Sequence, residues 1–307
     1  MIVQKSFEPA NTGTLYLVGT PIGNLEDMTY RAVRTLKEVD WIAAEDTRQT
    51  RKLLAHFGIA GRLVSYREHN KETAGEALLK RLLAGESVAL VSDAGLPAIS
   101  DPGSELVALA AANRVPVVPV PGANAALSAL IASGLSTAQF AFIGFLPRER
   151  KSLREELERW KCASATLLIY EAPHRIAKTL EALLEVWGDR RIVLARELTK
   201  KHEEFARGAI SECIALLKER QPLGEYVIVV EGAQGGCGMQ PAARETWWSG
   251  LSVAQHVERY MKQEGLTSKE AIKRAAADRG ERTRDVYNRY LAEKPPGRAW
   301  PEGLEEI

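Results

Sequence analysis

The sequence predicts an α/β fold made of two unlike domains, followed by a helical appendage. Short β-branched runs alternate with amphipathic stretches through the first half of the chain, and the same alternation resumes after Gly134. Beyond about residue 240 three short helical patterns follow without a strand. A chain of 307 residues is long enough for this arrangement. We therefore expect domains at residues 1–122, 123–239 and 240–307.

The first expected domain alternates strands with helices. Residues 14–19 (TLYLVG) have the continuous apolar character of a buried strand, and the helix expected at 29–39 has its apolar residues on one face. A strand at 41–44 precedes a helix that Asp46 caps and Gly58 ends. Further strands are expected at 63–66, 87–91 and 115–118, and further helices at 72–84 and 102–113.

The second expected domain begins with an apolar helix at 123–133, which ends at Gly134. Its strands are expected at 139–144, 166–170, 191–195 and 226–230, and its remaining helices at 149–160, 176–187 and 209–219. This spacing predicts a second sheet, separate from the first.

The appendage has the pattern of a helix-turn-helix-like hairpin. Thr267 and Glu270 form a capping box for a helix at 269–279, Gly280 ends it, and a helix at 282–291 follows. Its apolar residues predict a small core of its own. Its basic side chains, among them those of Arg282, Arg284 and Arg289, predict contacts with nucleic-acid phosphates.

Composition excludes several classes of protein. The 41 basic and 40 acidic residues nearly cancel, so a polyanion must be held by local basic patches such as 190–201 and 259–289. The three cysteines are far apart, which predicts reduced thiols in a cytoplasmic protein and no metal site. The most apolar segment, 117–132, is interrupted by prolines and a glycine, so we expect no membrane span.

The loop after the first strand, GTPIGNLED (residues 19–27), occupies the place of a phosphate loop without its chemistry. It has no terminal lysine and serine or threonine, and Pro21 removes one amide donor. The carboxylates of Glu26 and Asp27 repel phosphate. We therefore expect no phosphate binding here.

The stretch VSDAGLPAISDPG (residues 91–103) ends a strand with turn formers and carboxylates but no lysine or arginine. We expect Asp101 to cap the helix that begins at Pro102. Backbone groups together with the Asp93 carboxylate suit a ligand that carries hydroxyls, amides and a positive charge. S-adenosylmethionine has these groups and no phosphate.

Several blocks occur in one order: GTLYLVGTPIGN, EDTRQTRKLL, Glu68-His69-Asn70, SDAGLPAISDPG, PVPGANAALSAL, GFLPRER, YEAPHR and RELTKKHEE. Together they resemble the tetrapyrrole-methylase-like class of S-adenosylmethionine methyltransferases (class III). Within it the chain is similar, from about residue 13 to 291, to the ribosomal small-subunit methyltransferase I family. The resemblance implies two α/β domains facing a cleft that holds the methyl donor. It also implies that the enzyme is a homodimer and needs no metal. The implied reaction is methylation of the ribose 2′-hydroxyl of a cytidine in the decoding region of 16S rRNA, and the substrate is either the free rRNA or the small ribosomal subunit.

The resemblance also implies the site. The residues implied in cofactor binding are Pro21, Asp93, Ala94, Gly95, Leu96, Pro97, Ile99, Pro121, Gly122, Ala123, Asn124 and Tyr170. A ribose hydroxyl is a poor nucleophile, so a base, or a cation that stabilises the forming alkoxide, helps the reaction. YEAPHR and RELTK follow strands and offer such groups, and the catalytic candidates are Glu171, Arg175, Glu197 and Lys200. An alternative is that Glu171 and Glu197 pair with Arg175, Arg196 or Lys200 in a structural network.

Two other functions fit parts of the sequence. An enzyme of the same fold and donor can act on a tetrapyrrole or on a protein side chain, a modified histidine. A regulator that binds nucleic acid through the hairpin and has lost catalysis is the other alternative. The RNA-acting motifs argue against the first, and the intact loops at 92–97 and 121–124 argue against the second.

Overall fold

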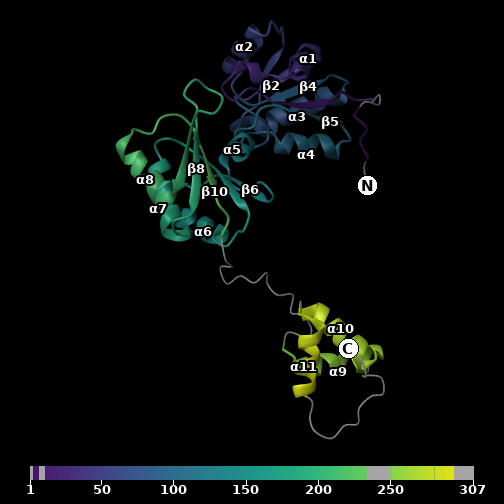
Figure 1. Cartoon of the computed structure of the whole chain (residues 1–307). Coiled ribbons are helices and arrows are strands. Elements are labelled where there is room, and N and C mark those ends of the chain that lie inside the picture. Colours follow the sequence, from purple (N-terminus) through teal and green to yellow (C-terminus); the bar gives the residue numbers. More distant parts are fainter. Residues whose placement is uncertain (1–2, 7–10, 234–247, 249, 280, 294–307) are drawn as a thin grey trace. The chain divides into compact units, whose positions relative to one another are not determined.

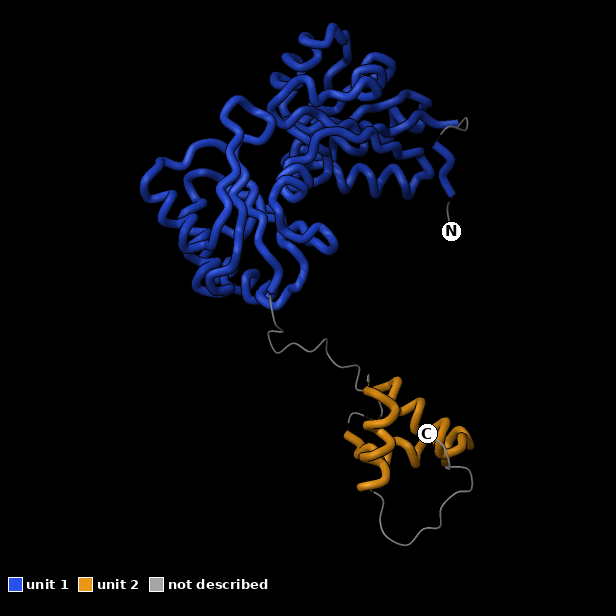
Figure 2. The backbone as a smooth tube through the Cα atoms, in the orientation of Figure 1, with its two compact units in different colours: residues 1–237 blue, residues 238–307 orange. Residues whose placement is uncertain are grey.

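The computed structural model describes residues 3–6, 11–233, 248, 250–279 and 281–293. The chain divides into two compact units, residues 1–237 and 238–307 (Figure 2). The first unit contains two five-stranded sheets, and the described part of the second unit is helical. The boundary expected at residues 122 and 123, between the two sheets, stays a prediction.

The first sheet is parallel throughout, with strand order β3-β2-β4-β1-β5. Its strands are β1 (Leu15–Val18), β2 (Trp41–Ala44), β3 (Leu63–Ser65), β4 (Val88–Val91) and β5 (Val117–Val120). Its helices are α1 (Tyr30–Glu38), α2 (Thr47–His56), α3 (Lys71–Leu83) and α4 (Ser104–Ala112), with short 3₁₀ turns η1 (Leu25–Asp27) and η2 (Glu68–Asn70). Apolar residues of α1 and α2 pack on one face and those of α3 and α4 on the other. The central strands are therefore buried on both faces, as their apolar sequences predict.

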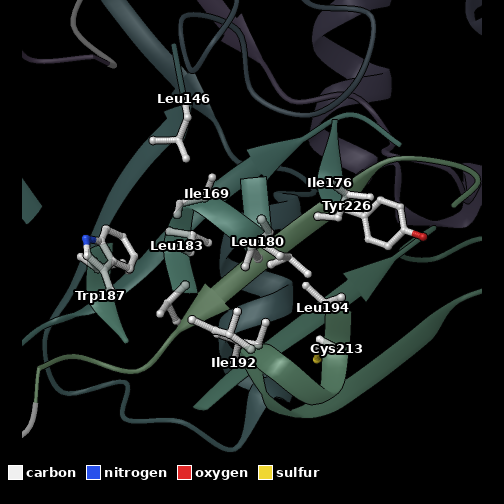
Figure 3. Packing of buried hydrophobic residues seen from close by; sticks show 14 of the residues in the cluster. Leu146, Ile169, Ile176, Leu180, Leu183, Trp187, Ile192, Leu194, Cys213 and Tyr226 are labelled. Atoms are coloured by element: carbon white, nitrogen blue, oxygen red, sulfur yellow. The ribbon is translucent and has the colours of Figure 1, made fainter. Parts of the chain in front are cut away.

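The second sheet is mixed, with order β6-β7-β10-β8-β9 and one parallel pair, β6 with β7. Its strands are β6 (Phe140–Phe145), β7 (Thr166–Glu171), β8 (Arg191–Arg196), β9 (Glu204–Ala209) and β10 (Tyr226–Val230). Its helices are α5 (Ala125–Ser133), α6 (Arg150–Trp160), α7 (Ile176–Trp187) and α8 (Ile210–Glu219). Helices α6, α7 and α8 cover one face and α5 packs on the other (Figure 1). Figure 3 shows Leu180 and Leu183 of α7 against Ile169, Ile192 and Leu194 of the sheet.

These sheets confirm the predicted fold class of two unlike α/β halves, with two corrections. Strand β9 was not predicted, because EFARGA (residues 204–209) has neither an apolar run nor a clear alternation. The expectation that Asp101 caps a helix at Pro102 is wrong. Helix α4 begins at Ser104, and its N-cap is Gly103 with φ of 152°.

The second unit contains α9 (Val253–Glu264), α10 (Ser268–Arg279) and α11 (Thr283–Glu293). Val257, Ala275 and Val286, one from each helix, belong to one small core. The predicted capping box is confirmed: the Thr267 amide donates to Glu270 Oε2 at 3.0 Å, and the Glu270 amide donates to Thr267 Oγ1 at 3.4 Å. The expected helix end at Gly280 lies outside the described residues.

In the part of the chain that the structure describes, no helix is both long and apolar enough to cross a membrane, and no cluster of three or more metal-ligating side chains occurs. Burial raises the pKa of the Cys213 thiol to about 11, so this thiol is protonated at neutral pH. Cys237 lies outside the described residues.

Candidate functional site

A cavity of about 420 Å³ lies between the two sheets of the first unit. Its walls come from the segment after β4, the first turn of α5 and the ends of β6, β7, β8 and β10 that face the first sheet. Ligands of open parallel sheets bind beyond the carboxyl ends of the strands. The carboxyl end of β4 leads into this cavity in the same way. The lining residues are Ile22, Glu45, Asp93, Ala94, Gly95, Leu96, Ile99, Ser100, Asp101, Asn124, Ala125, Phe145, Tyr170, Glu171, Ala172, Glu197, Leu198, Lys200, Glu225, Tyr226 and Val227.

Most of the residues expected at the site meet at this cavity. Those that line it are Asp93, Ala94, Gly95, Leu96, Ile99, Asn124, Tyr170, Glu171, Glu197 and Lys200. Those that do not are Pro21, Pro97, Pro121, Gly122, Ala123 and Arg175. Each of the latter is within four residues in sequence of a lining residue, so they belong to the supporting segments.

The loop after β1 holds the loop after β4 in place. The Thr20 amide donates to the Gly95 carbonyl at 2.9 Å, and the Gly95 amide donates back to the Thr20 carbonyl at 3.1 Å. Thr20 Oγ1 also donates to the Ser92 carbonyl at 3.2 Å. Gly95 has φ of 84°, a left-handed conformation that glycine adopts without strain. GTPIGN therefore supports the cavity wall, consistent with its lack of phosphate-binding chemistry.

The loop after β5 is placed by a close approach of two glycines. A β-carbon on Gly122 would lie 2.9 Å from the Cα atom of Gly19 and 3.0 Å from its carbonyl carbon. No side chain fits between these backbones, so glycine is required for the contact. The contact fixes the start of α5, where Asn124 Oδ1 accepts the Leu127 amide at 2.8 Å.

The backbone is strained in two segments of the cavity wall, residues 98–100 and 197–199. In the described part of the chain five non-glycine residues have positive φ, and four lie in these segments: Ala98 (67°), Ser100 (63°), Glu197 (50°) and Thr199 (65°). Each such conformation costs on the order of 1 kcal/mol and persists where the surroundings enforce it, commonly at functional sites.

The cavity is strongly acidic. Its lining contains six carboxyl residues, Glu45, Asp93, Asp101, Glu171, Glu197 and Glu225, and Lys200 is the single basic residue among the described lining residues. Burial, then the charges of Asp101 and Asp93, raise the pKa of Glu45. Burial also raises the pKa of Asp101, and the Asp93 charge adds to this effect. Such a site favours a cation and repels phosphate.

Glu171 and Arg175 form a buried support behind the wall. The Glu171 side chain is fully buried, and its carboxylate accepts Thr179 Oγ1 at 2.6 Å and the Ala172 amide at 2.8 Å. Arg175 Nε lies 3.4 Å from Glu171 Oε1, while its Nη2 donates to the carbonyls of Leu146 and Pro147. This is the pairing of the structural alternative, and it ties the ends of β6 and β7 together.

Glu197 and Lys200 are more open to the cavity. Lys200 Nζ donates to Glu197 Oε1 at 2.9 Å, and this ammonium lowers the pKa of Glu197. The Lys200 side chain lines the cavity and is 36% exposed. The Asn24 amide donates to Thr199 Oγ1 at 3.0 Å, which joins the GTPIGN loop to the turn that contains Lys200.

Aromatic side chains form another part of the wall. The Tyr170 hydroxyl accepts the Ala126 amide at 3.2 Å, and burial raises the pKa of this tyrosine. Phe142 and Phe145 pack edge-on against its ring, with centroids 4.9 and 5.6 Å away.

Sequence reasoning did not identify several lining residues as site residues. Glu45 directly follows β2, as the predicted residues Asp93 and Glu197 follow their strands, so the strand end was a usable signal for it. Glu225 instead directly precedes β10. Asp101 was interpreted as a helix cap. No comparable signal marks Phe145, because its side chain is directed by a register shift between β6 and β7.

Comparisons with known proteins relate the chain to one family. The family model "Tetrapyrrole (Corrin/Porphyrin) Methylases" matches residues 14–214. The chain is similar to the ribosomal RNA small subunit methyltransferase I of Halalkalibacterium halodurans, with 55% identity over 95% of this chain and 100% of that protein. It is also similar to the Bacillus subtilis protein of the same name, with 54% identity over 94% of this chain and 97% of that one.

Solved structures share the fold at low sequence identity. Diphthine synthase superposes with a TM-score of 0.56 and 18% identity, covering 72% of this chain and 90% of that one. Uroporphyrin-III C-methyl transferase from Thermus thermophilus, complexed with S-adenyl homocysteine, superposes with a TM-score of 0.52 and 22% identity, covering 71% of this chain and 97% of that one.

Proposed function

The chain belongs to the tetrapyrrole methylase family, as a member of the ribosomal RNA small subunit methyltransferase I family, and from this premise we propose its reaction. It transfers a methyl group from S-adenosylmethionine to the ribose 2′-hydroxyl of a cytidine in the decoding region of 16S rRNA. The acceptor is the RNA or the small ribosomal subunit, the reaction takes place in the cytoplasm, and the enzyme is a homodimer.

The acidic cavity is the observation that carries this proposal. S-adenosylmethionine is a cation at sulfur, has no phosphate and is rich in hydroxyl and amino groups. The lining contains six carboxyl residues, of which Glu171 has its carboxylate buried behind the wall and Glu197 is paired with Lys200. It also contains strand-end backbone groups and an aromatic wall, and its volume is within the usual range for small-molecule sites. The residues therefore fit this donor better than they fit a nucleotide phosphate.

The donor, when bound, supplies an electrophilic methyl carbon, and the protein supplies position and charge. Residues 93–96 and Asn124 hold the donor, while the carboxylates of Asp93 and Asp101 balance its positive charge. Lys200 faces the acceptor, where its ammonium stabilises the 2′-oxygen as the oxygen–methyl bond forms and the sulfur–methyl bond breaks. The hydroxyl proton leaves to water, and S-adenosylhomocysteine is the leaving group. Glu197 orients Lys200, and Glu171 with Arg175 keeps the wall rigid.

A label-transfer experiment tests this assignment. Purified protein, labelled S-adenosylmethionine and unmethylated small subunits should give labelled 16S rRNA, and mapping should place the methyl group on a ribose oxygen. Label on a base, on a porphyrin precursor or on a protein side chain would reject the acceptor and favour the corresponding relative of this fold.

The affinity for S-adenosylmethionine should fall as the pH is lowered from neutral toward the ordinary pKa of carboxyl groups, about 4. The pKa values of Glu45 and Asp101 are raised, so these groups take up protons above their ordinary pKa values and lose their attraction for a cation. Binding a cation lowers the same pKa values, so binding should release protons. Titration calorimetry in buffers of different ionisation enthalpy measures both effects.

S-adenosylhomocysteine provides the matched control, because it lacks the sulfonium charge and shares the rest of the donor. Its affinity should vary less over the same pH range, and Asp101→Asn should reduce the difference between the two ligands. Equal pH dependence for both ligands in the wild type would show that the carboxylates do not face the sulfonium.

A further inference from the structure

One of the residues that line the cavity is an exposed phenylalanine. Phe145, the last residue of β6, lines the cavity and remains 57% exposed. A large apolar side chain left in water forgoes the stabilisation that burial would give it. A ligand with an apolar face would cover it.

A backbone irregularity directs this ring toward the cavity. Along β6, Phe142 packs on the α5 face of the sheet, while Ala141 and Ile143 pack on the opposite face. Strict alternation would therefore place Phe145 with Ile143. Instead, the pairing with β7 shifts between Phe142 and Gly144, where Gly144 has φ of 77°.

The shift places Phe145 opposite Tyr170, which belongs to the α5 face. The next residue, Leu146, accordingly lies in the core on the other face (Figure 3). β-Bulges near active sites commonly re-aim a side chain in this way. A β-carbon at Gly144 would lie 3.4 Å from Ser100 Oγ, so the irregularity lies against the loop that follows β4.

We propose that Phe145 is a positioning residue that stacks on the nucleobase of the target nucleotide, an inference that rests on the proposed function. A ribose 2′-hydroxyl inside a structured RNA reaches an enclosed cavity when its nucleotide is turned out of the stack. The unstacked base then needs a new apolar partner, and aromatic side chains are the common one. The edge-on contact with Tyr170, at 5.6 Å, holds the Phe145 ring while leaving more than half of the side chain exposed.

The test compares variants at Phe145 with unmethylated small subunits as substrate. Phe145→Leu keeps an apolar side chain but removes the ring, and it should lower kcat/KM for the subunit by about tenfold to a hundredfold. Phe145→Tyr keeps the ring and should retain activity within about threefold. Affinity for S-adenosylmethionine should be unchanged in both variants.

Phe140→Leu is the matched control, because Phe140 is the first residue of the same strand, is 46% exposed and does not line the cavity. It should leave kcat/KM within about twofold of the wild-type value. Thermal unfolding of all three variants excludes loss of fold as the cause.

Three results overturn the stacking proposal alone: full activity of Phe145→Leu, equal loss in Phe145→Tyr, or a parallel loss of donor affinity. The last would mean that the ring contacts the donor instead. If the wild-type protein methylates no small-subunit rRNA, the proposed function and this inference are overturned together. Assaying the wild type before any variant distinguishes this outcome from the other three.

Discussion

Adding one methyl group at Gly122 is expected to weaken S-adenosylmethionine binding at least a hundredfold, about 3 kcal/mol. In Gly122→Ala the new β-carbon would meet the Cα, carbonyl carbon and carbonyl oxygen of Gly19 at 2.9, 3.0 and 3.1 Å. All three are backbone atoms, so relief requires moving the ends of β1 and β5 apart. Val18 and Val120 are paired there, and the loop that begins α5 moves with them. Calorimetry with the donor measures the loss.

Gly75→Ala is the matched control for this prediction. A β-carbon at Gly75, inside α3, lies 3.9 Å from the Tyr66 ring, which is an ordinary contact. The same substitution should there raise the free energy of unfolding by roughly 0.5–1 kcal/mol and leave donor affinity unchanged. Wild-type affinity in Gly122→Ala, with an unchanged unfolding temperature, would mean that the glycine contact does not shape the site.

Removing the Lys200 ammonium is expected to lower kcat by about two to three orders of magnitude without weakening the binding of S-adenosylmethionine. Lys200→Met keeps a long side chain, so the stem still fills its place. The carboxylate of Glu197 loses its 2.9 Å partner, and the cavity becomes more negative, which favours the sulfonium. Single-turnover methyl transfer and donor titration together separate these two effects.

Lys201→Met tests whether the effect is local. Lys201 is exposed, adjacent in sequence and absent from the cavity lining. Its loss should weaken RNA binding at most slightly, with kcat unchanged. Equal losses of kcat in the two variants, or a parallel loss of donor affinity in Lys200→Met, would assign Lys200 to general RNA attraction or to donor binding.

The sequence was informative wherever a local pattern decided the structure. Apolar runs located nine of the ten strands described in the two sheets, and caps such as Asp46 and Thr267 located helix starts. The loop after β4 is predicted to bind a ligand because it combines turn formers and carboxylates with no cation. These features depend on a few neighbouring residues, so they can be predicted from the sequence.

The remaining features depend on residues distant in sequence. Glu45, Asp101 and Glu225 come from three separate segments and form one acidic lining only because the two sheets face one cavity. Asp101 fitted a helix cap locally, but the helix starts later. The orientation of Phe145 depends on a register shift between β6 and β7, and no short-range pattern specifies such a shift.

Crystals soaked with S-adenosylmethionine test the central claim most directly, namely that the acidic cavity holds a sulfonium nucleoside. The expected result is continuous electron density for the donor along residues 93–96 and Asn124, with its sulfur closer to the carboxylates of Asp93 and Asp101 than to Lys200. A donor bound outside the cavity, or inside it with the sulfur beside Lys200, would contradict the account.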